Sequence, residues 1–266
     1  MKDIGFAGKI VVVTGGASGI GRATALAFAE RGATVVVVDV DETRGATLVD
    51  GVLPIEFLKA DVSNALEVQS VLEGILGRYG RPADILVSNA GIEDNRVGNL
   101  LTMPEDVLRR ILDVNLYGAI NCARVFVPAM PDGSKVVFVS SLQAFMACLP
   151  GTSYQASKAG LIGITKALAI ELGPRRINVN VICPGGVATE GMGAARGNDL
   201  GLDDYRRHNP LGRRARPEEM ALPILFLCSE WASYMTGQIV QVDGGMSAMG
   251  MPRAGPHVIG PDDPDR

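Results

Sequence analysis

The chain contains few cysteines, histidines and aromatic residues. Among 266 residues there are four cysteines and two histidines, and aromatic residues make up 5%. The cysteines lie far apart and form no CxxC pair, and neither His208 nor His257 lies near a motif. We therefore expect reduced thiols, no disulfide framework and no metal site. No run of about 18 apolar residues is present, so we expect no membrane span.

The chain also lacks an excess of positive charge. Its formal net charge is −4 and its isoelectric point is about 5.3, which gives no reason to expect a nucleic-acid partner. The segment Met1–Gly8 carries charge and has no long apolar core, so it does not resemble a secretory signal, and we expect a cytoplasmic protein. Hydrophobic residues make up 47% of the chain, enough for the core of one large α/β domain spanning residues 1–266.

Short β-branched segments alternate with longer helical ones along most of the chain. The first five short segments are almost continuously apolar, as expected for parallel strands that are covered on both faces. Alternation of this kind predicts right-handed crossovers and a Rossmann-like, doubly wound parallel sheet of about seven strands. The predicted strands are Ile10–Thr14, Thr34–Asp39, Ile55–Ala60, Ile85–Ser88, Val136–Ser140, Ile177–Ile182 and Ile239–Val242. The predicted helices are Ile20–Arg31, Asn64–Tyr79, Glu105–Ala129, Ser153–Leu172 and Pro217–Ser229.

Two stretches have no regular pattern. Residues 189–216 are rich in Gly, Arg and Asp and fall between a predicted strand and a predicted helix. We expect a substrate lid there. Residues 247–266 are rich in Pro and Asp and are expected to form an irregular tail.

A glycine-rich turn follows the first predicted strand and opens the first predicted helix. Its sequence is Thr14-Gly15-Gly16-Ala17-Ser18-Gly19-Ile20-Gly21. Glycines at these positions permit a tight turn and a close approach of the backbone to a pyrophosphate. The anion would then meet the positive end of the helix. Because the turn lies between a strand and a helix, it predicts a dinucleotide site rather than a plain loop.

Asp39 ends the second predicted strand, 18 residues after Gly21. A carboxylate at this place can accept hydrogen bonds from the hydroxyls of an adenosine ribose. Asp41 follows, and neither Ala17 nor Val40 is replaced by an Arg or Lys that would bind a 2′-phosphate. We therefore predict NAD rather than NADP as cofactor, with a plain turn role for Asp39 as the alternative.

Tyr154 and Lys158 stand four residues apart in a predicted helix and therefore project from one face. A lysine ammonium near a phenol favours the phenolate and lowers its pKa from about 10, which makes the tyrosine a usable acid or base. By spacing alone, this pair is also typical of an ordinary helix surface.

The run Tyr154-Gln155-Ala156-Ser157-Lys158 resembles the YxASK motif of the short-chain dehydrogenase/reductase family. The resemblance extends from about Gly8 to Met246, because other motifs of the family follow in order. These are the TGxxxGIG turn, Asp61-Val62, Asn89-Ala90-Gly91, Asp113-Val114-Asn115, Ser141 thirteen residues before Tyr154, and Pro184-Gly185.

The resemblance implies a catalytic tetrad of Asn115, Ser141, Tyr154 and Lys158. Tyr154 would exchange a proton with the substrate oxygen, and Ser141 would hydrogen-bond that oxygen and stabilise its charge. Lys158 would hold the nicotinamide ribose and tune Tyr154, while Asn115 would anchor a water that links Lys158 to solvent. The hydride would pass directly between the substrate and the nicotinamide.

The resemblance also implies a set of cofactor-binding residues. The pyrophosphate would contact the turn, and the adenine would lie against the segment after the third strand. The nicotinamide would pack on the segment after the sixth. The full set is Gly15, Ser18, Gly19, Ile20, Gly21, Asp39, Asp61, Val62, Asn89, Ala90, Gly91, Tyr154, Lys158, Pro184, Gly185, Val187 and Thr189.

Several of these roles have alternatives. Asn115 can instead cap or kink its helix, and Ser140 competes with Ser141, although the spacing favours Ser141. Cys183 is expected to be a packed thiol. Ser88 stands where the family commonly has Asn, so we expect the bonds between the strands at that point to be weakened or rearranged.

The substrate is the least specified part of the prediction. A neutral secondary alcohol or ketone is favoured, with a sugar or polyol as the alternative, in which case Glu93 and Asp94 would bind hydroxyls. An arginine cluster at 213, 214 and 216 could instead meet an anionic substrate, with a solvated run of charges as the alternative. The expected substrate-contacting residues are Ser141, Gln143, Leu149, Tyr154 and Met192, with Phe145 and Met146 nearby.

The resemblance implies an NAD-dependent dehydrogenase that forms homotetramers through Glu105–Ala129 and Ser153–Leu172. Because cellular NAD is mostly oxidised, alcohol oxidation is the favoured direction. Two other classes are considered. An isomerase or lyase with the same Tyr/Lys pair normally has a larger carboxy-terminal domain, and a non-catalytic NAD-binding protein would be expected to have lost part of the tetrad.

Overall fold

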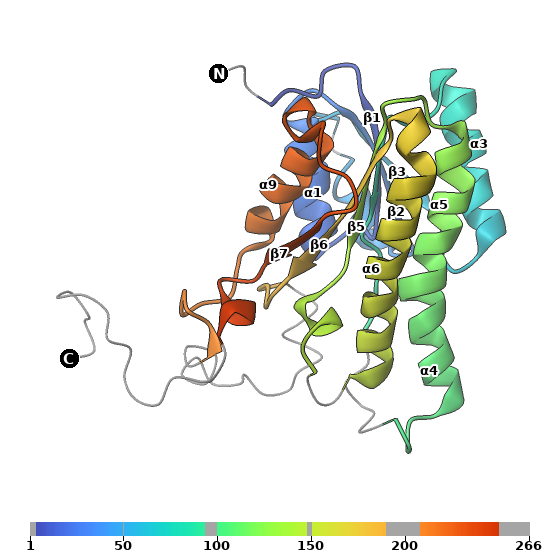
Figure 1. Ribbon diagram of the computed structural model, residues 1–266. Coiled ribbons are helices and arrows are strands. Elements are labelled where there is room, and N and C mark those ends of the chain that lie inside the picture. The colour runs from blue at the N-terminus through green and yellow to red at the C-terminus, as the bar shows by residue number, and fades with distance from the viewer. Residues whose placement is uncertain (1–3, 50, 94–99, 148–150, 190–207, 250–266) are drawn as a thin grey trace.

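Seven parallel strands form one sheet in the order β3-β2-β1-β4-β5-β6-β7. Figure 1 shows the computed structural model, which describes residues 4–49, 51–93, 100–147, 151–189 and 208–249. This arrangement confirms the predicted Rossmann-like fold. The strands are β1 (Ile10–Thr14), β2 (Thr34–Asp39), β3 (Ile55–Lys59), β4 (Ile85–Ser88), β5 (Lys135–Val139), β6 (Asn178–Pro184) and β7 (Ile239–Val242).

Helices cover both faces of the sheet (Figure 1). Because side chains alternate along a strand, Val11 and Val13 pack into one core while Ile10 and Val12 pack into the other. All four are buried, which explains why the strand is apolar throughout. The first core packs against α1 (Gly19–Ala29) and α9 (Pro217–Cys228). The second packs against α3 (Ala65–Tyr79), α5 (Gly118–Ala129) and α6 (Thr152–Leu172).

The helix predicted over Glu105–Ala129 is interrupted in the structure. It consists of α4 (Glu105–Leu112), a π-helical turn η1 (Asp113–Tyr117) and α5. A second difference is the five-residue helix α2 (Glu42–Ala46), which was not predicted. Asp41 caps α2 by accepting a hydrogen bond from the Arg44 N–H at 2.9 Å, and five residues are too few to give a helical period.

The site lies where the strand order reverses. From β1 the chain proceeds outward to β2 and β3, then returns to β4 on the other side of β1. In a doubly wound sheet this reversal leaves a crevice outside the carboxyl ends of the strands. Thr14, Asp39 and Ser88 end the three strands that border it.

Most of the expected lid and tail fall outside the described residues. Residues 190–207 and 250–266 are among those not described, so Met192 cannot be placed. The flanking Arg213 forms two bonds of 2.7 Å with the Glu219 carboxylate. In the described part of the chain, no helix is long and apolar enough to cross a membrane. In the same described residues, no three His, Cys, Asp or Glu side chains lie close enough together to bind a metal ion.

Candidate active site

The glycine-rich turn brings the backbone of β1 against the segment after β4. Gly15 has a φ of +62°, and a Cβ at this residue would lie 2.7 Å from Ala90 Cα. A Cβ on Gly21 would lie 2.1 Å from the Gly15 carbonyl oxygen. Any side chain at these positions would therefore displace the turn, and the amino terminus of α1 could not open onto the cavity.

Asn89 and Thr14 tie the ends of β1 and β4 together. The Asn89 amide donates to the carbonyl oxygens of Thr14 at 3.0 Å and Gly15 at 2.9 Å. The Thr14 hydroxyl accepts from the N–H groups of Asn89 and Ala90. Ser88 is buried within β4, so the junction in this chain is made by Asn89 and Thr14 without the family's usual first Asn.

The Asp39 carboxylate is held at the end of β2. One oxygen accepts from the Ala17 N–H at 3.0 Å and the other from the Asp41 N–H at 3.1 Å. The first bond links the carboxylate to the glycine-rich turn. Asp39 therefore lies beside the turn and lines the same cavity.

Asp61 lies after β3 and is bound by two other residues. The Ser63 hydroxyl donates to Asp61 Oδ1 at 2.6 Å, and Arg110 of α4 donates to Oδ2 at 2.8 Å. Burial acts to raise the pKa of the carboxyl, but the hydrogen bonds from Ser63 and Arg110 outweigh it and hold the pKa below its usual value. Asp61 is therefore ionised at neutral pH.

Tyr154 and Lys158 lie at the opposite end of the cavity, on α6. The Lys158 ammonium is 5.6 Å from the centre of the Tyr154 ring and donates to the Val139 carbonyl at 2.9 Å. Lys158 is buried, and burial lowers its pKa from 10.5 to about 8 even though interactions with Cys183 and Glu93 act to raise it. A cation is thus kept close to the phenol in a poorly solvated place.

The two serines after β5 have different surroundings. Ser140 Oγ donates to the Lys158 carbonyl at 2.8 Å, which fixes α6 against the sheet. Ser141 precedes the 3-10 turn η2 (Leu142–Ala144), and its Oγ accepts from the Gln143 N–H at 3.1 Å. Both line the cavity, but Ser140 also fixes the backbone at Lys158.

Asn115 is buried in η1 and lies behind the cavity. Its Oδ1 accepts from the Ile92 N–H at 2.7 Å, and its Nδ2 donates to the Ile92 carbonyl at 2.9 Å and to Ser157 Oγ at 3.2 Å. The structure has a π turn at this residue, and the alternative role of Asn115 as a helix cap or kink stays a prediction. Asn115 additionally joins the segment after β4 to α6, and π turns occur often at functional sites.

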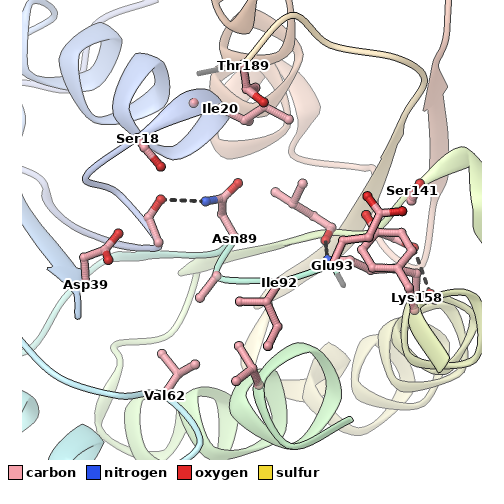
Figure 2. Close-up of a pocket in the computed structure, with 18 of the residues that line it drawn as sticks. Ser18, Ile20, Asp39, Val62, Asn89, Ile92, Glu93, Ser141, Lys158 and Thr189 are labelled. Carbon is pink, nitrogen blue, oxygen red and sulfur yellow. Dashed lines mark hydrogen bonds between the residues drawn. The ribbon is translucent and has the colours of Figure 1, made fainter. Parts of the chain in front are cut away.

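One cavity of about 430 Å³ joins these groups. Figure 2 shows Asp39 at one end and Ser141, Glu93 and Lys158 at the other, with Ser18, Ile20 and Thr189 along the wall. Most of the predicted site residues line it. These are Gly15, Ser18, Gly19, Ile20, Asp39, Asp61, Val62, Asn89, Ala90, Gly91, Ser141, Tyr154, Lys158, Pro184, Gly185, Val187 and Thr189.

Other predicted residues lie elsewhere. Gly21 and Asn115 support the cavity from behind, as described above. Gln143 does not line it, and its Oε1 is buried with no hydrogen-bond partner among the described residues. Leu149 and Met192 lie outside the described residues.

Several lining residues were not predicted. Ala60 and Val139 could have been found, because they end or follow strands that point at the cavity. Arg110 belongs to no motif, and its ion pair with Asp61 joins segments 49 residues apart. No sequence signal identified it.

Comparison with known proteins gives a consistent result. The model of a family described as enoyl-(acyl carrier protein) reductase matches residues 15–247. The 3-oxoacyl-[acyl-carrier-protein] reductase FabG of Thermotoga maritima is 38% identical over 245 residues, which cover 90% of this chain and 98% of that protein. The uncharacterized oxidoreductase YxbG of Bacillus subtilis is 35% identical, covering 92% and 93%.

Solved structures agree with these matches. A putative NAD(P)-dependent gluconate 5-dehydrogenase from Beutenbergia cavernae, with NADP bound at low occupancy, has a TM-score of 0.85 and 34% identity. The match covers 93% of this chain and 100% of that one. The crystal structure of gox2181 has a TM-score of 0.87 and 30% identity, covering 92% and 98%. By sequence, fold and family match, this chain belongs to the short-chain dehydrogenase/reductase family of oxidoreductases, which use a nicotinamide cofactor.

Proposed function

We propose that the protein is an NAD-dependent oxidoreductase that interconverts a secondary alcohol and a ketone by direct hydride transfer. The observation that carries this proposal is a single cavity with Asp39 at one end and Tyr154, Lys158 and Ser141 at the other. The glycine-rich turn fits a dinucleotide. Gly15 lies so close to Ala90 that a Cβ has no space there, and this tight turn brings the backbone at the start of α1 to the cavity wall, where a pyrophosphate would bind.

When bound, the nicotinamide supplies or accepts the hydride, and the residues of the chain handle the proton. The Tyr154 hydroxyl donates its proton to the substrate oxygen during reduction, and the Tyr154 phenolate takes the proton from the substrate hydroxyl during oxidation. The Lys158 ammonium lies beside the ring and stabilises the phenolate. Ser141 donates a hydrogen bond to the same oxygen and stabilises the charge that develops on it.

The remaining tetrad residue, Asn115, holds the segment after β4 against α6. The hydrogen bonds of its side-chain amide to Ile92 and Ser157 support this positioning role. The proposed water relay from Lys158 to solvent would begin at this residue. Pro184, Gly185, Val187 and Thr189 would pack on the nicotinamide, as their position after β6 on the cavity wall supports.

The choice of NAD rests on Asp39. A 2′-phosphate near this carboxylate would meet a negative charge instead of an Arg or Lys, and would compete for the bond to the Ala17 N–H. Asp39→Asn removes the charge and keeps the shape. We expect the ratio of kcat/KM for NADP to that for NAD to rise about tenfold, which corresponds to about 1.4 kcal/mol. The matched control, Asp132→Asn, removes an exposed carboxylate that pairs with Arg175 away from this cavity and should leave the ratio unchanged; an unchanged ratio in Asp39→Asn contradicts the NAD assignment.

The substrate class is tested with a panel. The protein is mixed with NAD or NADP and a set of secondary alcohols, vicinal diols and sugars, and with reduced cofactor and the matching ketones and a 3-oxoacyl thioester. We expect turnover of alcohols and ketones, faster with the NAD pair than with the NADP pair. Turnover of the thioester alone would instead assign the activity in the name of the Thermotoga maritima relative.

The remaining features of the proposal concern assembly and location. We propose a cytoplasmic homotetramer in which contacts between subunits involve α4, α5 and α6, and a single domain with residues 189–216 as a lid. Gel filtration with light scattering tests the tetramer. Limited proteolysis with and without NAD and substrate tests the lid.

A further inference from the structure

Glu93 brings a carboxylate to the end of the cavity where the proposed chemistry takes place. Glu93 lines the cavity together with Ser141, Tyr154 and Lys158. Figure 2 shows it beside Ser141 and Lys158, at the opposite end from Asp39. A substrate whose oxygen is bound by Tyr154 and Ser141 would therefore place its neighbouring atoms close to Glu93.

The chain is fixed immediately before Glu93. Both backbone polar groups of Ile92 are bonded to the Asn115 side chain, the N–H at 2.7 Å and the carbonyl at 2.9 Å. Asn115 is itself buried, at 1% exposure. The backbone at the residue before Glu93 is thus held by a buried side chain, which helps to position a group that selects substrates.

Glu93 also supplies the negative charge at the Tyr154–Lys158 end of the cavity. Among the described lining residues, the other carboxylates are Asp39 and Asp61, and both belong to the adenosine end. The interaction with Glu93 raises the pKa of Lys158 against the effect of burial, so the negative charge acts at the Tyr154–Lys158 pair. A carboxylate accepts hydrogen bonds and donates none when ionised.

We propose that Glu93 determines specificity, by accepting a hydrogen bond from a hydroxyl on the carbon next to the reacting carbinol and by excluding substrates with an anionic group at that position. The substrate class is then a neutral vicinal diol or polyol and the corresponding α-hydroxyketone. This inference rests on the proposed alcohol dehydrogenase activity and narrows it. A site that hydrogen-bonds a substrate hydroxyl disfavours an analogue that lacks it, because the analogue forgoes that hydrogen bond.

The test compares three substrates of similar size in the wild type and in Glu93→Gln. They are a simple secondary alcohol, the vicinal diol of the same chain length, and a hydroxy acid with its carboxylate on the adjacent carbon. Glutamine keeps the shape of the side chain and removes the charge. The matched control is Glu105→Gln, which removes an exposed carboxylate of α4 that pairs with Arg109.

The readout is the ratio of kcat/KM values between substrates. Any effect of the variant on folding, cofactor binding or the proton step applies to all three substrates and cancels in the ratio. In the wild type we expect the diol to be preferred over the simple alcohol, and the hydroxy acid to be the poorest. In Glu93→Gln the preference for the diol should fall about tenfold, as expected when a charged acceptor is replaced by a neutral one, and the hydroxy acid should improve relative to both.

Two other outcomes are distinguishable. If the wild type oxidises the simple alcohol but the ratios in Glu93→Gln equal those of the wild type and of Glu105→Gln, the role of Glu93 is refuted while the proposed function stands. If the wild type oxidises none of the three with either cofactor, the proposed function fails, and the inference fails with it.

Discussion

Replacing Lys158 with methionine tests whether the ammonium in the site is as poorly solvated as the structure indicates. Lys158 is buried, and its pKa falls from 10.5 to about 8. At about 1.4 kcal/mol per pKa unit, the buried charge costs about 3 kcal/mol of folding stability. Methionine has a similar length and carries no charge.

The sign of the pH dependence follows from the direction of this shift. Below pH 8 the ammonium is charged in both states and its full cost is present. Between pH 8 and 10.5 the unfolded chain binds more protons than the folded one, so stability rises with pH. The unfolding free energy of the wild type, relative to Lys158→Met, should therefore rise by about 3 kcal/mol from pH 7 to pH 10.5.

The assay is urea unfolding of the cofactor-free protein, followed by far-ultraviolet circular dichroism at fixed protein concentration. Taking the difference between the unfolding free energies of the two proteins at each pH removes the contribution of groups that titrate alike in both. Lys166→Met serves as the control, because Lys166 is an exposed lysine two turns further along α6. The poorly solvated ammonium would be refuted if the unfolding free energy of the wild type relative to Lys158→Met changed with pH no more than that relative to Lys166→Met.

Two further substitutions test the support of the cavity. Gly21→Ala places a Cβ 2.1 Å from the Gly15 carbonyl and should weaken NAD binding by at least about tenfold in calorimetric titration; Gly77→Ala, with nothing within 4 Å of its Cβ, should leave it unchanged. Asn115→Ala leaves both polar groups of Ile92 without their partner, and should lower the unfolding free energy by about 1–3 kcal/mol together with kcat. Equal NAD affinity in the two glycine variants, or an Asn115→Ala protein of wild-type stability, would contradict these assignments.

The strands were predictable because local chemistry determines them. The predicted ends of β1, β2, β4 and β7 agree with the structure, since each is a short run rich in β-branched residues with Asp, Ser or Gly at its end or directly after it. Most of the site was predictable for a similar reason: the motifs follow strand ends, and parallel strands bring those ends to one edge of the sheet.

What could not be predicted depends on contacts between distant segments. The π turn interrupts a helix that was predicted to be continuous, and it is accompanied by hydrogen bonds between the Asn115 side chain and Ile92 and Ser157. Arg110 enters the site through Asp61, which no helical period reveals. The poorly solvated state of Lys158 likewise depends on tertiary burial rather than on the spacing from Tyr154.

The central claim is that Tyr154 carries the proton in an NAD-dependent hydride transfer. The most direct measurement compares the wild type, Tyr154→Phe and the control Tyr234→Phe, which alters a fully exposed tyrosine, by recording the absorbance of reduced nicotinamide and NAD affinity in parallel. Tyr154→Phe should bind NAD as the wild type does and lose at least about a hundredfold in kcat, while Tyr234→Phe remains fully active. Normal turnover by Tyr154→Phe would contradict the account.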